Sequence, residues 1–271
     1  MRIPVLCYHS QIIAGNDYRH NGHRALAHDL EYIQQQGLRV VPLTWVAEWQ
    51  RGERSDTDLQ HAVAISFDDG MSSDFRAVNH PEYGELAGFL PILEAFQQNH
   101  GQQQAQLHAT AFVIASDRAR RDIDQACHNA IGWDDNSDWE QAAKHPLLSL
   151  ENHSWDHNHE TCNESPGYPQ GNFHSIHNFD LCELEIRRSS EYLHQRYQIS
   201  PRLFAYPYGH TNPYLSEEYL PKHGPKMGLE AAFTTAGTYV EQGQSRWLLP
   251  RFVHGFHWRS EEEFQQLLQA A

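Results

Sequence analysis

Residues 62–70 have the sequence AVAISFDDG, and this stretch decides how the rest of the chain is interpreted. The run from Ala62 to Phe67 is continuously apolar, which is typical of a buried strand. It leads directly into Asp68, Asp69 and Gly70, residues that also suit a turn. The sequence therefore predicts a buried strand with two adjacent carboxylates at its carboxyl end.

Strands and helices are predicted to alternate on both sides of this strand. The other expected strands cover residues 2–8, 38–42, 107–115, 147–150, 203–206, 230–234 and 247–253. Helices are expected at 24–36, around 45–49 with Thr44 as the N-cap, at 84–98, in two pieces within 117–145, at 179–197, around 213–222 and from about 260, with loops at 55–60 and 158–178. This alternation favours an α/β fold with a mostly parallel sheet, open or closed into a barrel. The chain shows neither an internal repeat nor a linker-like segment, so a single domain over residues 1–271 is expected.

The composition excludes several function classes. With 20 Lys and Arg against 35 Asp and Glu, the formal net charge is −15, which argues against binding to nucleic acid or to an anionic membrane surface. No run approaches the about 18 apolar residues of a membrane helix. The first residues, MRIPVLCYHS, lack the features of a signal peptide, so a cytoplasmic protein is expected unless a leader has been removed. The four cysteines are scattered, which favours reduced thiols.

Four polar clusters follow predicted strands directly. They are His9-Ser10, Asp68-Asp69-Gly70, His153-Ser154-Trp155-Asp156-His157 and Tyr206-Pro207-Tyr208-Gly209. In parallel α/β folds the carboxyl ends of the strands form the ligand site. Clusters that are far apart in the sequence are therefore expected to converge in space.

Two of these clusters carry candidate metal chemistry. Adjacent carboxylates repel each other, and a divalent ion bound to Asp69 would relieve this while leaving Asp68 free as a base. The spacing of His153 and His157 brings two imidazoles within reach of one ion, although roughly one or two such spacings arise by chance in a chain with 20 histidines. Two histidines and one carboxylate leave coordination positions open for water and substrate. An ordinary turn at Asp68-Asp69 and unrelated histidines remain the alternative.

The cluster at residues 206–209 is aromatic and rigid. Pro207 fixes its own φ and Gly209 permits a sharp turn, so a backbone N–H can be aimed at a ligand. Tyr206 and Tyr208 could stack on a sugar ring, and Trp155 is a further candidate for substrate contact. A packed turn with buried tyrosines is the alternative.

The chain resembles the polysaccharide deacetylases, carbohydrate esterase family 4, which share the NodB homology domain. The resemblance rests on SFDDG (66–70), HSWDH (153–157) and FAYPYG (204–209), with PVLCYHS (4–10), ATAFVIAS (109–116) and LPRF (249–252) as further matches. It implies a distorted (β/α) barrel of about seven parallel strands. It also implies metal-dependent hydrolysis of an N-acetyl, or alternatively an O-acetyl, group on a carbohydrate.

The resemblance also implies roles for individual residues. Asp68 would be the general base, and Asp69, His153 and His157 would bind one divalent ion, with zinc expected and nickel or cobalt as alternatives. Ser154 would support the histidine loop. The backbone N–H of Tyr208 would stabilise the oxyanion that forms at the acetyl carbonyl.

Two positions depart from the family pattern. Many members carry an arginine in the third motif to orient the base, where this chain has Ala205, and Arg251 could replace it. Many members also place a catalytic histidine in a late Leu-x-His motif, which is missing here. Members that open with a strand like residues 4–8 look circularly permuted, so His9 is favoured as the catalytic acid over His254, with His257 nearby.

Three other functions remain open from the sequence. An enzyme of the same fold could hydrolyse a small amide or ureide instead of a sugar derivative. A non-catalytic carbohydrate-binding protein would be expected to have lost Asp68 or a metal ligand, and neither is lost. A histidine-rich storage protein would be expected to cluster its histidines in flexible tracts.

Overall fold

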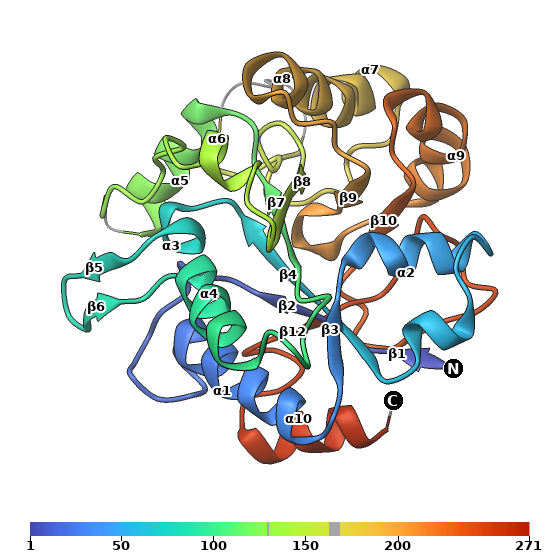
Figure 1. The fold of residues 1–271 in the computed structure, drawn as a ribbon. Helices are drawn as coiled ribbons and strands as arrows, with labels where there is room; N and C mark the ends of the chain where they lie inside the picture. The colour runs from blue at the N-terminus through green and yellow to red at the C-terminus, as the bar shows by residue number, and fades with distance from the viewer. Residues whose placement is uncertain (129, 163–168, 271) are drawn as a thin grey trace.

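The computed structural model describes residues 1–128, 130–162 and 169–270, and its centre is a curved parallel sheet (Figure 1). The strand order is β10-β9-β8-β7-β4-β2-β12, and every neighbouring pair is parallel. The strands are β2 (Val5–Tyr8), β4 (Ala62–Asp69), β7 (Ala109–Val113), β8 (Leu148–Asn152), β9 (Leu203–Ala205), β10 (Ala231–Phe233) and β12 (Phe252–Val253), and β3 (Arg39–Val41) pairs with the first half of β4.

The segment 249–253 closes the sheet into a barrel. Leu249 forms a parallel bridge with Phe233 at the end of β10, and a few residues later β12 pairs with β2. One short segment therefore contacts both edges of the sheet. This confirms the predicted distorted barrel with about seven parallel strands, and it places β2 beside β12, the last strand of the chain.

Helices surround the barrel on its outer side (Figure 1). They are α1 (Gly22–Gln35), α2 (Leu43–Gln50), α3 (Ser72–Phe75), α4 (Phe89–His100), α5 (Asp117–Cys127), α6 (Trp139–Ala142), α7 (Phe179–Cys182), α8 (Arg188–Tyr197), α9 (Leu220–His223) and α10 (Glu261–Gln269). A π-helical turn (Glu183–Arg187) joins α7 to α8, and another (Tyr214–Tyr219) precedes α9. Short 3₁₀ turns lie at Asp56–Leu59, Pro207–Gly209 and Gly224–Met227.

Alternation along β4 separates the outer core from the inside of the barrel. Ile65 and Phe67 pack in the outer cluster, which also contains residues of α1 and α4. Ala64 belongs to the inner cluster, where it lies with residues of β2, β7 and β10. Because side chains alternate along a strand, Ser66 and Asp68 continue on the inner face. The same strand thus stabilises the core and delivers a carboxylate to the mouth of the barrel.

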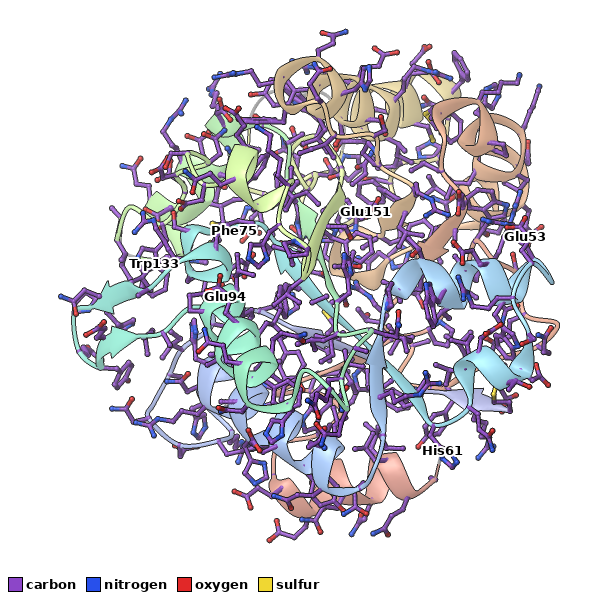
Figure 2. The ribbon with its side chains drawn as sticks, in the orientation of Figure 1. Glu53, His61, Phe75, Glu94, Trp133 and Glu151 are labelled. Atoms are coloured by element: carbon purple, nitrogen blue, oxygen red, sulfur yellow. The ribbon has the colours of Figure 1, made fainter. Side chains whose placement is uncertain are left out.

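A buried carboxyl group ties β8 to β9, which share only the pair Asn152 and Phe204. Glu151, labelled in Figure 2, accepts hydrogen bonds from the backbone N–H groups of Arg202 (2.6 Å) and Leu203 (2.8 Å). Burial raises the pKa of Glu151 to about 8. These contacts hold the two strands together where their backbone pairing is sparse.

The predicted helix at 84–98 is wrong at its beginning. Residues Gly84–Leu86 form β6, which pairs with β5 (Val78–His80) as an antiparallel hairpin. Gly88, at φ +81°, separates this hairpin from α4, and a Cβ there would lie 2.3 Å from the Arg76 carbonyl oxygen. The close approach requires glycine and forces the helix to begin at Phe89. Trp133, labelled in Figure 2, packs in one cluster with Val78 and Leu86 of this hairpin.

Other predicted boundaries also shift. Pro42, not Thr44, precedes α2, and the expected loop 55–60 contains a 3₁₀ turn with a capping box between Ser55 and Asp58. Pro4 divides the predicted strand 2–8 into β1 (Arg2–Ile3) and β2, and β1 pairs with β11 (Val240–Glu241) in a separate small sheet. Of the predicted strand 247–253 only β12 is regular.

Residues 163–168 of the predicted loop 158–178 lie outside the described residues, and the remainder is irregular up to the start of α7.

Within the part of the chain that the structure describes, no helix is both long and apolar enough to cross a membrane.

Candidate active site

A cavity of about 420 Å³ opens at the carboxyl ends of the strands. Its walls include the last two residues of β4 and residues that follow β2, β7, β8, β9 and β10. The site residues among them are His9, Asp68, Asp69, His153, His157 and Tyr208. The four clusters therefore meet at one place. The parallel sheet causes this convergence, because all of its strands end at the same edge.

Asp69, His153 and His157 form a compact group at the floor of this cavity. One ligand atom from each of the three lies within 4.8 Å of the others. The Oδ1 atom of Asp69 is 3.5 Å from Nε2 of His153 and 3.7 Å from Nε2 of His157. Two imidazole nitrogens therefore face one carboxylate oxygen.

The protonation states in this group suit a divalent ion. The Nδ1–H of His153 donates to the Ala205 carbonyl oxygen (2.9 Å), so Nε2 is the ring nitrogen that faces Asp69. Burial and the neighbouring His153 lower the pKa of His157 to about 3, so its imidazole is neutral. Burial opposes ionisation of Asp69, but the two histidines hold its pKa well below the usual range. Burial opposes the charged form of His153, but the carboxylates of Asp68 and Asp69 raise its pKa, so an ion bound there would displace a proton from this imidazole. Two imidazoles and one carboxylate are a donor set that fits zinc or a similar ion.

The loop that carries the two histidines is held by side-chain hydrogen bonds. The Ser154 backbone N–H donates to Asn152 Oδ1 (2.7 Å), and the His157 backbone N–H donates to Ser154 Oγ (2.9 Å). Among the described residues, eight non-glycine residues have positive φ, and five of them lie in this site: Asp69, Ser154, His157, Asn158 and Tyr208. Strained backbone of this kind concentrates where a fold holds functional groups in place.

Asp68 is fixed beside this group by a buried arginine. Arg251 is completely buried and donates from Nη1 to Asp68 Oδ1 (2.6 Å) and from Nη2 to Oδ2 (2.8 Å). Ser66 Oγ accepts a further hydrogen bond from Nη1 (3.1 Å). Burial alone would raise the pKa of Asp68, but Arg251 and His153 lower it to about 2. Arg251 thus occupies the place that the sequence suggests for it and keeps Asp68 ionised.

Three histidines were candidates for a catalytic acid, and the structure separates them. His9 lines the cavity, and its Nε2 lies 4.0 Å from Asp68 Oδ2. His254 instead bonds through Nε2 to the Tyr18 carbonyl oxygen (3.0 Å) and stacks on Tyr8, and burial lowers its pKa to about 4. His257 accepts the backbone N–H of Val253 on Nδ1 (2.8 Å).

Three of the residues expected to contact substrate, Trp155, Tyr206 and Pro207, do not line the cavity. Trp155 is 8% exposed and packs between the guanidinium of Arg188, 3.6 Å above its ring, and the edge of Tyr192. Tyr206 is buried and donates its hydroxyl to the Trp247 carbonyl oxygen (2.8 Å). Pro207 is buried too, and only Tyr208 of this set lines the cavity, with its ring against His157 at 4.3 Å. The expectation for Trp155, Tyr206 and Pro207 is therefore corrected, because packing turns them away from the site.

The structure adds cavity residues that the sequence did not single out. The side-chain amide of Gln11 donates to Asp69 Oδ2 and so constrains that carboxylate from its far side. Ile12 and Phe256 line the cavity and are 61% and 69% exposed. Cys127, His128 and His159 line it from α5 and the histidine loop. The position of Gln11, two residues after His9, is the one signal that could have marked it.

Comparisons with known proteins agree with this geometry. The family model for polysaccharide deacetylase matches residues 55–227. No curated protein matches the chain. Among solved structures, the Streptococcus pyogenes deacetylase PplD in complex with acetate is 16% identical with a TM-score of 0.64, and the match covers 99% of this chain and 98% of that one.

Two further structures are similar. A de-N-acetylase from Aggregatibacter actinomycetemcomitans is 16% identical with a TM-score of 0.64, with 98% of this chain and 100% of that one covered. IcaB from Ammonifex degensii is 18% identical with a TM-score of 0.58, with 99% and 96% covered. Identities this low establish a shared fold. The family model, in contrast, matches more than half of the chain and includes Asp68, Asp69 and both loop histidines. The chain therefore belongs to the polysaccharide deacetylase family, hydrolases that cleave carbon–nitrogen bonds of acetylated carbohydrates.

Proposed function

We propose that this protein is a metal-dependent hydrolase that removes N-acetyl groups from a carbohydrate. The observation that carries the proposal is that two adjacent carboxylates, Asp68 and Asp69, have different partners. Asp69 faces two imidazoles, whereas Asp68 is held by Arg251 and faces His9. One carboxylate is thereby available for an ion and the other for a proton.

The metal-binding residues would be Asp69, His153 and His157, with zinc as the expected ion. A divalent ion at this place supplies Lewis-acid polarisation of the acetyl carbonyl and lowers the pKa of water. Gln11 and the Ala205 carbonyl oxygen hold two of these ligands from behind. Such supporting hydrogen bonds fix the direction in which the ligand atoms point.

Asp68 is the proposed general base. Its pKa of about 2 keeps it ionised at neutral pH, and the Arg251 fork fixes both oxygens while leaving lone pairs toward the cavity. Asp68 would take a proton from the attacking water at a carboxylate oxygen. A base with so low a pKa is weak, so its contribution comes mainly from position.

His9 and Tyr208 complete the proposed proton and charge transfers. His9, as imidazolium, would give its Nε2 proton to the amine nitrogen that leaves the acetyl group. The backbone N–H of Tyr208 would donate to the acetyl oxygen as negative charge develops there. Tyr208 sits at φ +59°, and a Cβ on the following Gly209 would be 1.9 Å from Thr235 Oγ1, so this turn is held closely against the loop after β10.

The printed names of similar structures support acetyl hydrolysis, since one is a deacetylase in complex with acetate and another a de-N-acetylase. The test is acetate release from a panel containing N-acetylated sugar oligomers, O-acetylated xylan and small amides, with metal-stripped and zinc-reloaded protein. We expect release from N-acetylated oligomers that is lost on stripping and restored by zinc. Release from small amides alone would replace the proposal with the small-amide alternative, and activity that survives complete stripping would refute metal dependence.

A further inference from the structure

A second group of potential metal ligands lies next to the first and includes a thiol without a role in the proposed reaction. One ligand atom each from Cys7, His9 and Asp68 lies within 4.8 Å of the others. None of these residues belongs to the group formed by Asp69, His153 and His157. Two separate sets of three potential donors thus lie side by side at this end of the barrel, and Cys7 is buried below the residues that line the cavity.

The sheet explains why these three side chains meet. Cys7 and His9 are two residues apart at the end of β2, so they project from the same face of the strand. Cys7 pairs in register with Ser66, which lies two residues before Asp68 on β4. The thiol, the imidazole and the carboxylate therefore come to the inner edge of the barrel together.

The chemistry of this group selects the kind of ion. Burial raises the pKa of the Cys7 thiol, so an ion that binds there must displace the thiol proton to solvent. The resulting set of one thiolate, one imidazole and one carboxylate binds borderline and soft ions such as Zn²⁺ and Cd²⁺, whereas Mg²⁺ and Ca²⁺ prefer oxygen ligands. Cys7 is fully buried, so an ion must enter from the cavity past His9 and Asp68. The guanidinium of Arg251 already shares both oxygens of Asp68, which weakens this group relative to the first.

We propose that Cys7, His9 and Asp68 form a second site for a thiophilic divalent ion, filled only after the first site and inhibitory when filled. Oδ2 of Asp68 lies 4.0 Å from His9 Nε2 and 3.8 Å from His153 Nε2, so it stands between the two groups. An ion at the second site engages the general base and the catalytic acid at once. The proposed binding of the ion does not depend on the proposed function, whereas the proposed inhibition rests on it.

The test titrates Cd²⁺ into protein that already holds one equivalent of Zn²⁺. Bound metal, the ultraviolet absorption of thiolate-bound cadmium and acetate release are followed together. We expect about one further equivalent to bind, the thiolate absorption to grow with it, and acetate release to fall in step. Mg²⁺ is expected to produce neither the absorption nor the inhibition.

Variants of the three relevant cysteines identify the thiol. Cys7→Ala is expected to lose the absorption and to require at least about tenfold more Cd²⁺ for the same fractional inhibition, because loss of a supporting contact alone commonly costs 10- to 100-fold in metal affinity. Cys7→Ser, with a nearly isosteric side chain, repeats the test should alanine prevent folding. Cys182→Ala removes another buried thiol as a matched control, and Cys127→Ser removes the exposed thiol at the cavity.

The outcomes separate this inference from the proposed function. An absorption that persists in both Cys7 variants, or that disappears in Cys127→Ser, overturns the second site, as does binding of a single equivalent in the wild type. Protein that shows the absorption through Cys7 but releases no acetate in its one-metal form supports the site and refutes the proposed function.

Discussion

The variant Arg251→Lys tests whether the bidentate pair between Arg251 and Asp68 fixes the position and the pKa of Asp68, the proposed general base. Lysine keeps the positive charge but has a single nitrogen, so it cannot reproduce the two bonds of 2.6 and 2.8 Å. A hydrogen bond to a charged group contributes about 1.5–3 kcal/mol, and each 1.4 kcal/mol corresponds to about a tenfold change in a rate or equilibrium constant. We therefore expect kcat/KM to fall by about 10- to 100-fold.

The pH profile carries the more specific part of this prediction. The pKa of Asp68 is about 2 because Arg251 and His153 oppose the effect of burial. One lost bond of 1.5 kcal/mol or more corresponds to a rise of at least about one pKa unit. Because the base must be ionised, a higher pKa moves the acid limb of the kcat/KM profile to higher pH. Acetate release measured between pH 3 and 8, with circular dichroism recorded at each pH to verify that the protein is folded, checks this.

Stability should change in the same direction. A carboxyl group with a depressed pKa stabilises the fold above its unfolded-state pKa near 4, and this contribution disappears as the pH falls through about 2. Arg251→Lys should therefore melt at a lower temperature than wild type at pH 7, and the difference should shrink as the pH approaches 2.

A surface pair provides the control for the substitution itself. Arg202 also holds a carboxylate with two bonds, both 2.9 Å to Glu230, but it lies at the side of the barrel and not in the cavity. Arg202→Lys should leave the pH profile in place. If Arg251→Lys keeps kcat/KM within threefold of wild type, and the acid limb of its kcat/KM profile does not move, then Arg251 determines neither the position nor the pKa of Asp68.

Three further predictions concern the other site residues. His153→Ala and His157→Ala should each lower the metal content of purified protein, measured by elemental analysis, and unchanged content in both would refute the assigned ligands. Asp68→Asn should keep the fold and the metal but lose about 10²–10⁴-fold in turnover, whereas near-normal turnover would make Asp68 a structural turn residue. His9→Ala should slow release from an N-acetyl sugar far more than from an activated aryl acetate, and His254→Ala should mainly lower the melting temperature; the reverse pattern would make His254 the acid.

The sequence predicted the fold, and it predicted that the candidate site residues converge in space, because both follow from the positions of strand ends. An apolar run that stops at Asp68 and Asp69 marks the carboxyl end of a buried strand, and parallel strands bring all such ends to one edge. Asp69, His153 and His157 could therefore be grouped without a structure. Arg251 could be suggested because Ala205 left the usual place of an arginine empty.

The sequence could not predict in which direction the side chains of turn residues point. The loop around Trp155 has positive φ at Ser154 and at His157. With this backbone course, the indole of Trp155 packs against Tyr192 of α8 and not into the cavity. Tyr206 is the last residue before a turn, where strand alternation still directs it into the core. Gln11 and Phe256 lie in irregular segments whose course depends on packing across the whole barrel, so no local pattern marks them.

The position of Arg251 on the segment that closes the barrel links catalytic competence to the completion of folding. Until residues 249–253 add to the sheet, β2 and β10 both expose an unpaired edge, and Asp68 lacks its counter-charge. A nascent or partly opened chain would then already contain all three proposed metal ligands, yet its proposed base, Asp68, would be unoriented. Hydrolytic activity should consequently appear last during refolding and disappear first under mild denaturation, which makes turnover itself a sensitive reporter of whether the barrel is closed.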